Sequence, residues 1–396
     1  MTAIARTEIA RAARPEESEA VLEILCQAFG LDQEAARPIF YADPYFDLAC
    51  KRVLSLPGVG IVSCLTVVPT LLRIGGAVVP AAGIAGVATR PAFQRRGYAA
   101  SLLRATILAL YIEIGLPVSL LHPLSAPFYQ QLGWEYASRQ VRWLAAPASL
   151  PACAEADLVR PASDNDWPVI RALHDTQTRT GTGSFARDDR RWQLIQLPVP
   201  GREAFVHEHQ GRITGYCVWE RHDVLHLLEM EGSTDDARRG LVGFLARQPD
   251  ALVEWTASPA LLTQFGLSWA GLTPEPGVML RIVNLESALS LLHPAHYAPA
   301  LAELGATLTV HSADSLCPEN TRPLRLTADG VTPGAPGDSP RLYADIRVWA
   351  RLYFGDLLPS DAAAENLLAV DSPQTLQLAD RLFPRREPYV APLDQF

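Results

Sequence analysis

The alternation of apolar and polar residues in the first third of the chain predicts a sheet with helices packed against it. A short strand is expected at residues 6–13. Residues Pro15 to Phe29 are expected to form an amphipathic helix, because acids fill its first turn and apolar residues recur at helical spacing. A loop of mixed aromatic and acidic residues, 41–47, comes next. Further strands are expected at 51–57, 60–74, 77–89, 117–122 and 134–144, with helices from 99 to about 115 and at 126–132.

Residues 157–275 repeat this plan in a degraded form. The run Ala237-Arg238-Arg239-Gly240 corresponds to Gln94-Arg95-Arg96-Gly97 of the first copy, with the glutamine replaced by alanine. Further along, Leu262 stands where the first copy has Tyr129. We therefore expect the second copy to keep the fold and to have lost the chemistry. Its strands are expected near 203–209, 212–220 and 224–230, and a helix at 164–173.

The last part of the chain, residues 276–396, has a different pattern, in which short strands alternate with helices around a Pro- and Gly-rich loop at 328–339. No catalytic constellation is visible in it. Its strands are expected near 277–283, 306–311, 322–327 and 341–345, and its helices at 285–292, 297–303, 346–353, 361–369 and 373–380.

Composition favours a globular protein of two or three domains. The chain has 396 residues, of which 48% are hydrophobic and 19% charged, so it can bury sizeable cores. Its formal net charge of −9 argues against nucleic acid as the main partner, because phosphate binding needs a basic face. A negative field attracts cationic small molecules instead.

The six cysteines are scattered, without Cys-x-x-Cys or Cys/His metal spacing, so we expect free thiols in a reducing compartment and no metal site. Arg6, Glu8 and Arg11 lie where a signal peptide would need apolar residues. No apolar run reaches the length needed to cross a membrane. These features favour a cytoplasmic protein.

The stretch from Val87 to Ala100 is the strongest candidate for chemistry. It joins a strand to a helix, and the first N–H groups of a helix form an anion site together with the helix dipole. Gly97 and Ala99 keep bulky side chains away, and the two preceding arginines can bind phosphate oxygens. The alternative is an ordinary turn with solvated arginines.

The spacing Gln94-x-x-Gly97-x-Ala99, after a strand and a proline, resembles the acetyl-CoA pyrophosphate loop of the GNAT acetyltransferase superfamily. The order of elements in the first copy also resembles the GNAT order. The resemblance implies acetyl-CoA as cosubstrate, with the pantetheine held by backbone N–H groups of the strand. The residues expected to bind it are Val87, Ala88, Thr89, Gln94, Arg95, Arg96, Gly97, Tyr98, Ala99 and Ala100.

The whole chain resembles the enhanced-intracellular-survival (Eis) family of N-acetyltransferases. The resemblance divides it into a catalytic GNAT domain (1–150), a degenerate GNAT domain (151–275) and a sterol-carrier-protein-like domain (276–396). In that family the C-terminal carboxylate reaches the active site, the subunits form hexamers, and the substrates are amines, including aminoglycosides and lysine side chains.

Two catalytic residues are expected from the resemblance. Tyr129 stands where the family has the general acid that protonates the leaving thiolate, although a core aromatic is the common alternative. The carboxylate of Phe396 is expected to be the general base. His122, Asp43 and Asp47 are other candidates for the base, and a tail that simply packs on the surface is the alternative for Phe396.

The expected function is acetyl transfer from acetyl-CoA to a primary amine, either on a cationic small molecule such as an aminoglycoside or polyamine, or on a lysine side chain. The expected partners are therefore such amines and copies of the same chain. Two non-enzymatic alternatives remain. One is a catalytically silent CoA-binding regulator, which would need a damaged loop or a replaced Tyr129. The other is a carrier of lipids or other hydrophobic molecules that uses residues 276–396 and would need an apolar cavity there.

Overall fold

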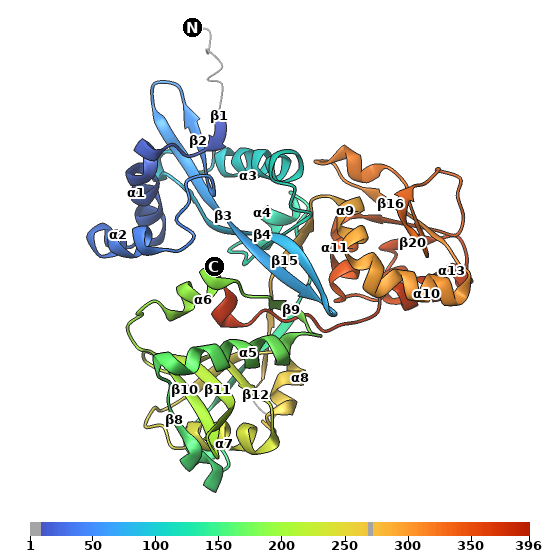
Figure 1. Ribbon diagram of the computed structural model, residues 1–396. Coiled ribbons are helices and arrows are strands. Elements are labelled where there is room, and N and C mark those ends of the chain that lie inside the picture. Colours follow the sequence, from blue (N-terminus) through green and yellow to red (C-terminus); the bar gives the residue numbers. More distant parts are fainter. Residues whose placement is uncertain (1–8, 268–271) are drawn as a thin grey trace.

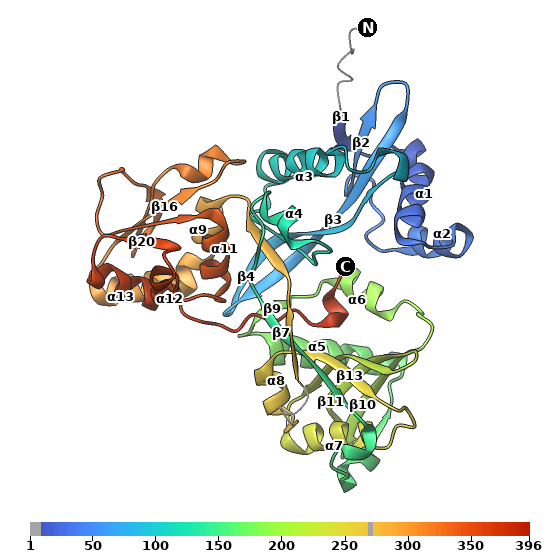
Figure 2. The ribbon, with the colours of Figure 1, turned by 180° about the vertical axis from the view of Figure 1, so that it is seen from behind.

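The computed structural model describes residues 9–267 and 272–396 and arranges them in three lobes, each built around its own sheet (Figures 1 and 2). The expected strand at 6–13 appears as β1 (Ile9–Ala12), and residues 6–8 lie outside the described residues. The sheets mix parallel and antiparallel strands and carry helices, so the predicted α/β class is confirmed. Within the described ranges, no helix is both long and apolar enough to cross a membrane.

The first sheet has the order β1-β2-β3-β4-β5-β15-β6, and β9 pairs with β3. Neighbouring residues of a strand face opposite sides, so Val53 packs under α1 while Leu54 packs under α3. The other bounds are β2 (Lys51–Leu56), β3 (Gly60–Ile74), β4 (Ala77–Thr89), β5 (Val118–Leu121), β6 (Glu135–Tyr136), β9 (Thr182–Phe185), β15 (Met279–Ile282), α1 (Ser18–Phe29), α2 (Gln33–Ala42), α3 (Tyr98–Ala109) and α4 (Ala126–Gln130).

The second sheet has the order β14-β7-β13-β12-β11-β10-β8, with three tryptophans, Trp143, Trp219 and Trp255, in its core. Its elements are β7 (Arg139–Ala145), β8 (Val159–Pro161), β10 (Arg202–His209), β11 (Arg212–Arg221), β12 (Leu225–Gly232), β13 (Val253–Ala257), β14 (Thr273–Pro276), α5 (Trp167–Thr178), α6 (Asp189–Gln196), α7 (Asp235–Leu245) and α8 (Pro259–Gln264).

The first two lobes exchange strands. The expected strand at 134–144 is divided at Ser138: β6 stays in the first sheet and β7 joins the second. In return, β15, expected in the last region, enters the first sheet between β5 and β6. The two chain segments cross where the Ser138 hydroxyl accepts a hydrogen bond from Val278 N at 2.9 Å. A Cβ on Gly277 would lie 2.1 Å from that hydroxyl, so the crossing requires glycine there.

The third lobe has the sheet order β18-β17-β16-β19-β20, and its core is continuous with that of the first sheet. Trp349 and Phe383 lie in this shared cluster with Leu72 of β3 and Val118 of β5. Its elements are α9 (Leu285–Leu292), α10 (Ala298–Leu304), β16 (Leu308–Ala313), β17 (Leu324–Thr327), β18 (Gly330–Pro333), β19 (Arg341–Asp345), α11 (Ile346–Phe354), α12 (Pro359–Ala364), β20 (Leu368–Val370) and α13 (Pro373–Leu382).

After α13 the chain leaves the third lobe as an extended tail. In both views this red segment passes between the first two lobes and ends near α6 (Figures 1 and 2). Its only regular structure within the described residues is a 3-10 turn at Pro392–Asp394. We propose domain boundaries at residues 150 and 275. Three strands, β7, β9 and β15, pair in the sheet of another domain than the one these boundaries assign them to.

Several elements differ from the prediction. Helix α2 was not expected, because Pro38 interrupts its pattern and none of its residues is buried. The helix expected at 361–369 ends at Ala364, and β20 takes up the remaining apolar residues. The loop expected at 328–339 contains β18, which pairs with β17 through a tight turn.

Candidate active site

The distinctive feature of the first sheet is that the parallel strands β4 and β5 separate before either strand ends. Their parallel pairing ends at Gly83 and Leu120, while β4 continues to Thr89. A bulge in β4, with Gly86 at a φ of +56°, breaks the register with β3 near this point. The sheet therefore has a split in its middle, with one edge of β4 unpaired along it.

Backbone alternation places two predicted residues on this open edge. Arg90 N donates to Val62 O at 2.9 Å, which directs the Arg90 and Ala88 amides toward β3. The N–H groups of Thr89 and Val87 then point away from β3, toward the split. An extended ligand with alternating carbonyl and amide groups could pair with this edge as an added strand would.

The turn that follows forms an anion site at the start of α3. Gly97 precedes the helix with a φ of +87°, and a Cβ there would meet nothing within 4 Å, so the space above it is open. The first helical amide with an acceptor is that of Ser101, which donates to Gly97 O at 2.9 Å. The amides of Tyr98, Ala99 and Ala100 precede it and have no acceptor in the helix.

The side chains of the turn leave those amides accessible. Gln94 turns back and donates from Nε2 to Thr89 O at 3.2 Å, which closes the turn. Arg95 and Arg96 are exposed, and the Arg96 guanidinium lies 5.4 Å from the Phe93 ring. The arrangement combines free amides and two cations, as a bound pyrophosphate requires.

The corresponding turn in the second lobe has no such opening. The Thr234 side chain caps α7 by accepting from Ala237 N at 3.1 Å. Arg238 and Arg239 form ion pairs with Asp235 and Asp236 on the same helix. The Ala237 amide and the two arginines thus have partners within this turn and helix.

Tyr129 lies in α4, almost wholly buried against the core of the first lobe. Its ring makes edge contacts with Phe128 and Trp134, at centroid distances of 5.0 and 6.2 Å. Burial raises the pKa of its phenol, and no described residue hydrogen-bonds to the hydroxyl. Tyr129 is therefore a protonated, unengaged donor at neutral pH.

Phe396, the last residue of the chain, lies at the mouth of the split. A Cβ on Gly83 would be 2.6 Å from the Phe396 ring, so only glycine admits the ring where β4 and β5 part. The ring also stacks on Phe185 of β9, with a centroid distance of 6.3 Å. The tail therefore packs into the first lobe at the predicted site.

His122, which directly follows β5, lies beside the same ring at a centroid distance of 6.0 Å. Burial lowers the pKa of its imidazole to about 4, so it is neutral at pH 7. Its Nε2 atom has no hydrogen-bond partner in the described part of the chain. A neutral His122 adds no positive charge against an approaching ammonium group.

Asp43 and Asp47, the other acids considered for the base, and Asp394 of the tail are engaged elsewhere. Asp43 and Asp47 accept hydrogen bonds from the amides of Tyr45 and Ala49, at 2.8 and 2.9 Å, within their own turns. Asp394 is wholly buried in ion pairs with arginines of the second lobe. The cationic acceptor stays a prediction that rests on the net charge of the chain.

A cavity of about 650 Å³ lies beside the end of the tail, and sequence patterns gave no sign of it. It is lined by α2, by α6 and the segment after it, by residues of β10, β11 and β12, and by the tail, and its lining is mostly apolar. The charged pair at its wall, Arg202 and Glu220, is joined at 2.6 Å and so is internally neutralised. Representative lining residues are Ile39, Leu194, Leu197, Val199, Leu228 and Leu393.

Comparison with known proteins identifies each lobe. Residues 10–137 and 183–282 match two families, each described as an acetyltransferase (GNAT) domain. Residues 291–391 match a family described as a sterol carrier protein domain. The chain is 27% identical over 358 residues to N-acetyltransferase Eis of Mycobacterium tuberculosis, covering 83% of this chain and 84% of that protein.

Solved structures share the whole arrangement. A GCN5-related N-acetyltransferase from Anabaena variabilis superposes with a TM-score of 0.83 at 22% identity, over 98% of this chain and all of that one. Eis1 from Mycobacterium abscessus superposes with a TM-score of 0.75 at 19% identity, over the same shares. At these identities the two structures show a common fold.

We predict that Gly97→Asp lowers the affinity for acetyl-CoA, the donor that GNAT acetyltransferases use, by roughly a hundredfold or more, because a carboxylate then faces the anion site. Gly115→Asp is the matched control, since Gly115 also has a positive φ of +74° and open space around it, but lies at the other end of the helical segment. Calorimetric titration measures both. Equal affinities for the two variants would show that the turn after β4 is not the phosphate site.

Proposed function

Because the chain belongs to the Eis-like family of GNAT acetyltransferases, with two GNAT domains followed by a sterol carrier protein domain, we propose that it transfers the acetyl group of acetyl-CoA to a primary amine through the split of its first sheet. One observation carries this proposal: the open edge of β4 begins at Gly83, where the chain's last residue packs, and ends in the turn that forms the free anion site.

The donor is held from two sides in this proposal. The amides of Val87 and Thr89 bind the pantetheine arm, with Ala88 between them facing β3. The turn from Gln94 to Ala100 binds the pyrophosphate, through amides that have no other acceptor. When bound, acetyl-CoA supplies a thioester carbonyl activated for attack by an amine.

Three proton transfers accompany the reaction, two from the nitrogen and one to the sulfur. A primary amine is an ammonium ion at pH 7, so it must lose a proton before its lone pair can form the new C–N bond. The Phe396 carboxylate is the base for that proton, directly or through a water. As the C–S bond breaks, the sulfur leaves with the electron pair, and the buried phenol of Tyr129 supplies its proton. The nitrogen, which is positively charged after attack, loses its second proton to water as the amide forms, and a proton from solvent restores the phenol.

The acceptor pocket in this proposal is the cavity of about 650 Å³ beside the tail, because Gln395 lines it one residue before the proposed base. Its apolar walls suit an amine carried on an apolar body, which includes the stem of a lysine side chain. The net charge of −9 still favours cationic acceptors such as polyamines and aminoglycosides over anionic ones.

Two further expectations belong to the proposal. All six cysteines are free in the structure, which supports a reducing, cytoplasmic location. The homohexamer rests on the family resemblance alone.

We predict that Tyr129→Phe lowers kcat by about 10²- to 10⁴-fold with little change in the dissociation constant of acetyl-CoA, because the hydroxyl acts on the leaving sulfur only in the transition state. Steady-state kinetics and donor titration test this. Tyr111→Phe, in the helical segment after α3, is the control and keeps the wild-type rate. A Tyr129→Phe enzyme with an unchanged kcat would remove the phenol from the mechanism.

We predict that deletion of Phe396, and separately a short polar extension beyond it, each abolish most of the activity while the chain still folds and binds acetyl-CoA. Both changes displace the terminal carboxylate. Phe396→Leu separates the two parts of the residue, because it retains the carboxylate but loses the ring contact with Phe185, and an intermediate rate is expected. Intact mass establishes that the assayed chain ends at Phe396. Full activity in the extended chain would contradict the proposed base.

We predict that primary amines are acetylated and that their matched alcohols are not, because the proposed base and acid are arranged for a nucleophile that starts as an ammonium ion. A screen of alkyl and aryl monoamines, polyamines, aminoglycosides and lysine peptides, with release of free thiol as the readout, ranks the acceptors. A preference for neutral hydroxyl or anionic acceptors would overturn the proposed substrate class.

A further inference from the structure

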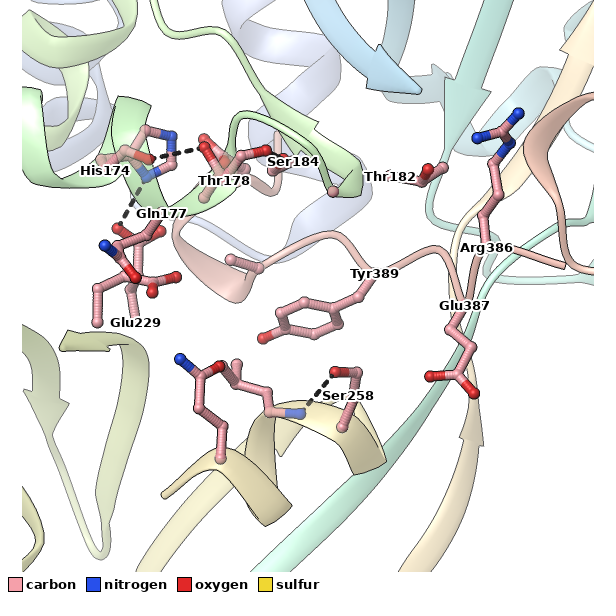
Figure 3. A pocket seen from close by; sticks show the side chains of 17 residues that line it. His174, Gln177, Thr178, Thr182, Ser184, Glu229, Ser258, Arg386, Glu387 and Tyr389 are labelled. Carbon is pink, nitrogen blue, oxygen red and sulfur yellow. Dashed lines mark hydrogen bonds and ion pairs between the residues drawn. The ribbon is translucent and has the colours of Figure 1, made fainter. Parts of the chain in front are cut away.

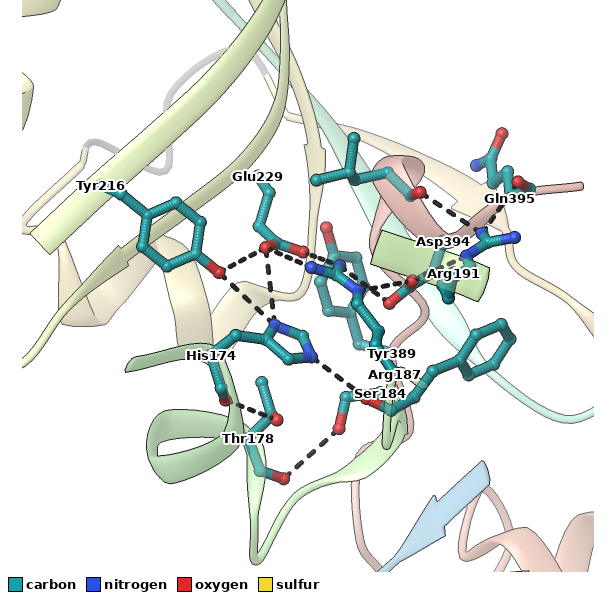
Figure 4. A network of polar contacts seen from close by, with 12 residues as sticks. His174, Thr178, Ser184, Arg187, Arg191, Tyr216, Glu229, Tyr389, Asp394 and Gln395 are labelled. Carbon is teal, nitrogen blue, oxygen red and sulfur yellow. Dashed lines mark hydrogen bonds and ion pairs between the residues drawn. The ribbon is translucent and has the colours of Figure 1, made fainter. Parts of the chain in front are cut away.

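The tail is held by a cluster of charges buried inside the second lobe (Figure 4). The wholly buried Arg187 guanidinium lies between two carboxylates: it donates to Glu229 of β12 and, at 2.8 and 3.0 Å, to Asp394 of the tail. The carboxylates are likewise cut off from solvent. Fully buried charges of this kind persist only when each is paired.

Arg191, on α6, binds the backbone of the last residues directly. Its Nη2 donates to Leu393 O at 3.3 Å and to Gln395 O at 3.0 Å, and its Nε reaches Asp394 at 3.3 Å. The carbonyl of Gln395 belongs to the peptide bond that leads into Phe396. Arg191 thus fixes the tail one bond away from its terminal residue.

A stack of side chains extends the same connection to the ring of Phe396. The Arg191 guanidinium lies 5.6 Å from the centre of the Phe185 ring, and the Phe185 ring stacks on Phe396. Leu393, between these anchors, packs in the core of the second lobe with Trp192 and Tyr216. Backbone hydrogen bonds, ion pairs and packing contacts therefore all fix residues 393–396 of the tail.

The charges of Arg187, Glu229 and Asp394 stabilise one another in their ionised forms. Burial raises the pKa of Glu229, but the charge of Arg187 and the further contacts with Arg187 and His174 together hold that pKa below its usual range. The carboxylates Glu229 and Asp394 hold the pKa of Arg187 above its usual range in turn, against its own burial. Glu229 also accepts a hydrogen bond from the Tyr216 hydroxyl.

The cluster sits where the second lobe repeats the split of the first. The parallel pairing of β12 with β13 ends at Leu227 and Trp255, and Glu229 lies just beyond it. The tail crosses this opening, where the Tyr389 hydroxyl donates to Thr256 O at 2.8 Å. Figure 3 shows Tyr389 among residues of α5 and α8, around a cavity of about 270 Å³ that the tail helps to enclose.

We propose that the second GNAT domain is the binding site for the chain's own C-terminal segment, and that Arg187 and Arg191 are positioning residues for the Phe396 carboxylate. The inference rests on the proposed function of that carboxylate as the base. Stability alone does not account for the cluster, because a buried ion pair can often be replaced by apolar residues without loss of stability. An accurately placed general base does require rigid support.

The test compares Arg191→Met with the wild type in the full chain. Arg187 still donates to Asp394 in this variant, so the Asp394 carboxylate keeps a cationic partner, which it shares with Glu229. We expect kcat to fall by roughly tenfold or more while the dissociation constant of acetyl-CoA stays within about twofold. Arg191→Lys keeps the charge near Asp394 without the forked contact to two carbonyls, and an intermediate kcat is expected.

Arg160→Met is the matched control, because Arg160 pairs with Asp166 and Glu208 in the same lobe. Wild-type kcat is expected for it. If Arg160→Met lowered kcat as much as Arg191→Met, the effect of Arg191→Met would be explained by general damage to the second lobe.

A double-mutant cycle separates positioning from general damage. In a chain that lacks Phe396, Arg191→Met is expected to change the remaining rate by less than about twofold, because the base it positions is already absent. A further loss of the same size as in the full chain would overturn the inference. If deletion of Phe396 lowers the rate and Arg191→Met does not, the inference fails and the proposed base stands. If deletion of Phe396 has no effect, the proposed base itself fails.

Discussion

The parting of β4 from β5 is the constraint on which the rest of the molecule depends. Backbone amides within a protein must find acceptors, and the edge of β4 beyond Gly83 has none from β5. The same strand ends in the turn whose helical amides are also free. A single extended, anionic ligand can satisfy both sets, and this is the shape of the donor that GNAT acetyltransferases use.

The second lobe meets the same constraint in a different way. Its split between β12 and β13 is covered by the chain's own tail, and its helix start is closed by Thr234 and by ion pairs along α7. In our account the duplicated fold thus serves twice, once to hold a substrate and once to hold the segment that completes the first site. The third lobe shares a core with the first sheet, and the tail runs from it between the first two lobes (Figure 1).

The sequence predicted the parts of the site that depend on local spacing. The turn around Gly97 can be recognised from a few neighbouring residues, and the structure has α3 directly after it. The replacement of Tyr129 by Leu262 in the second copy can be recognised in the same way, and the two residues lie in helices α4 and α8. The mixed class of the sheets also follows from the order of elements.

The rest depends on contacts between distant residues. The exchange of β7 and β15 is decided at a crossing of Ser138 with Gly277, which no local pattern reveals. No local pattern indicates that Asp394 is buried, because its partners, Arg187 and Arg191, are more than two hundred residues away. The apolar cavity beside the tail is lined by α2, α6 and the tail, among other elements. Helix α2 could not be predicted because it has no buried face.

The most direct test of this account is the stoichiometry of acetyl-CoA binding to the intact chain, measured by calorimetry at a known concentration of active protein. One site per chain is expected, because among the described residues only those of the first lobe combine a free strand edge with a free anion site. Two sites of similar affinity per chain would contradict it, since the second lobe would then bind the donor where the account places the tail.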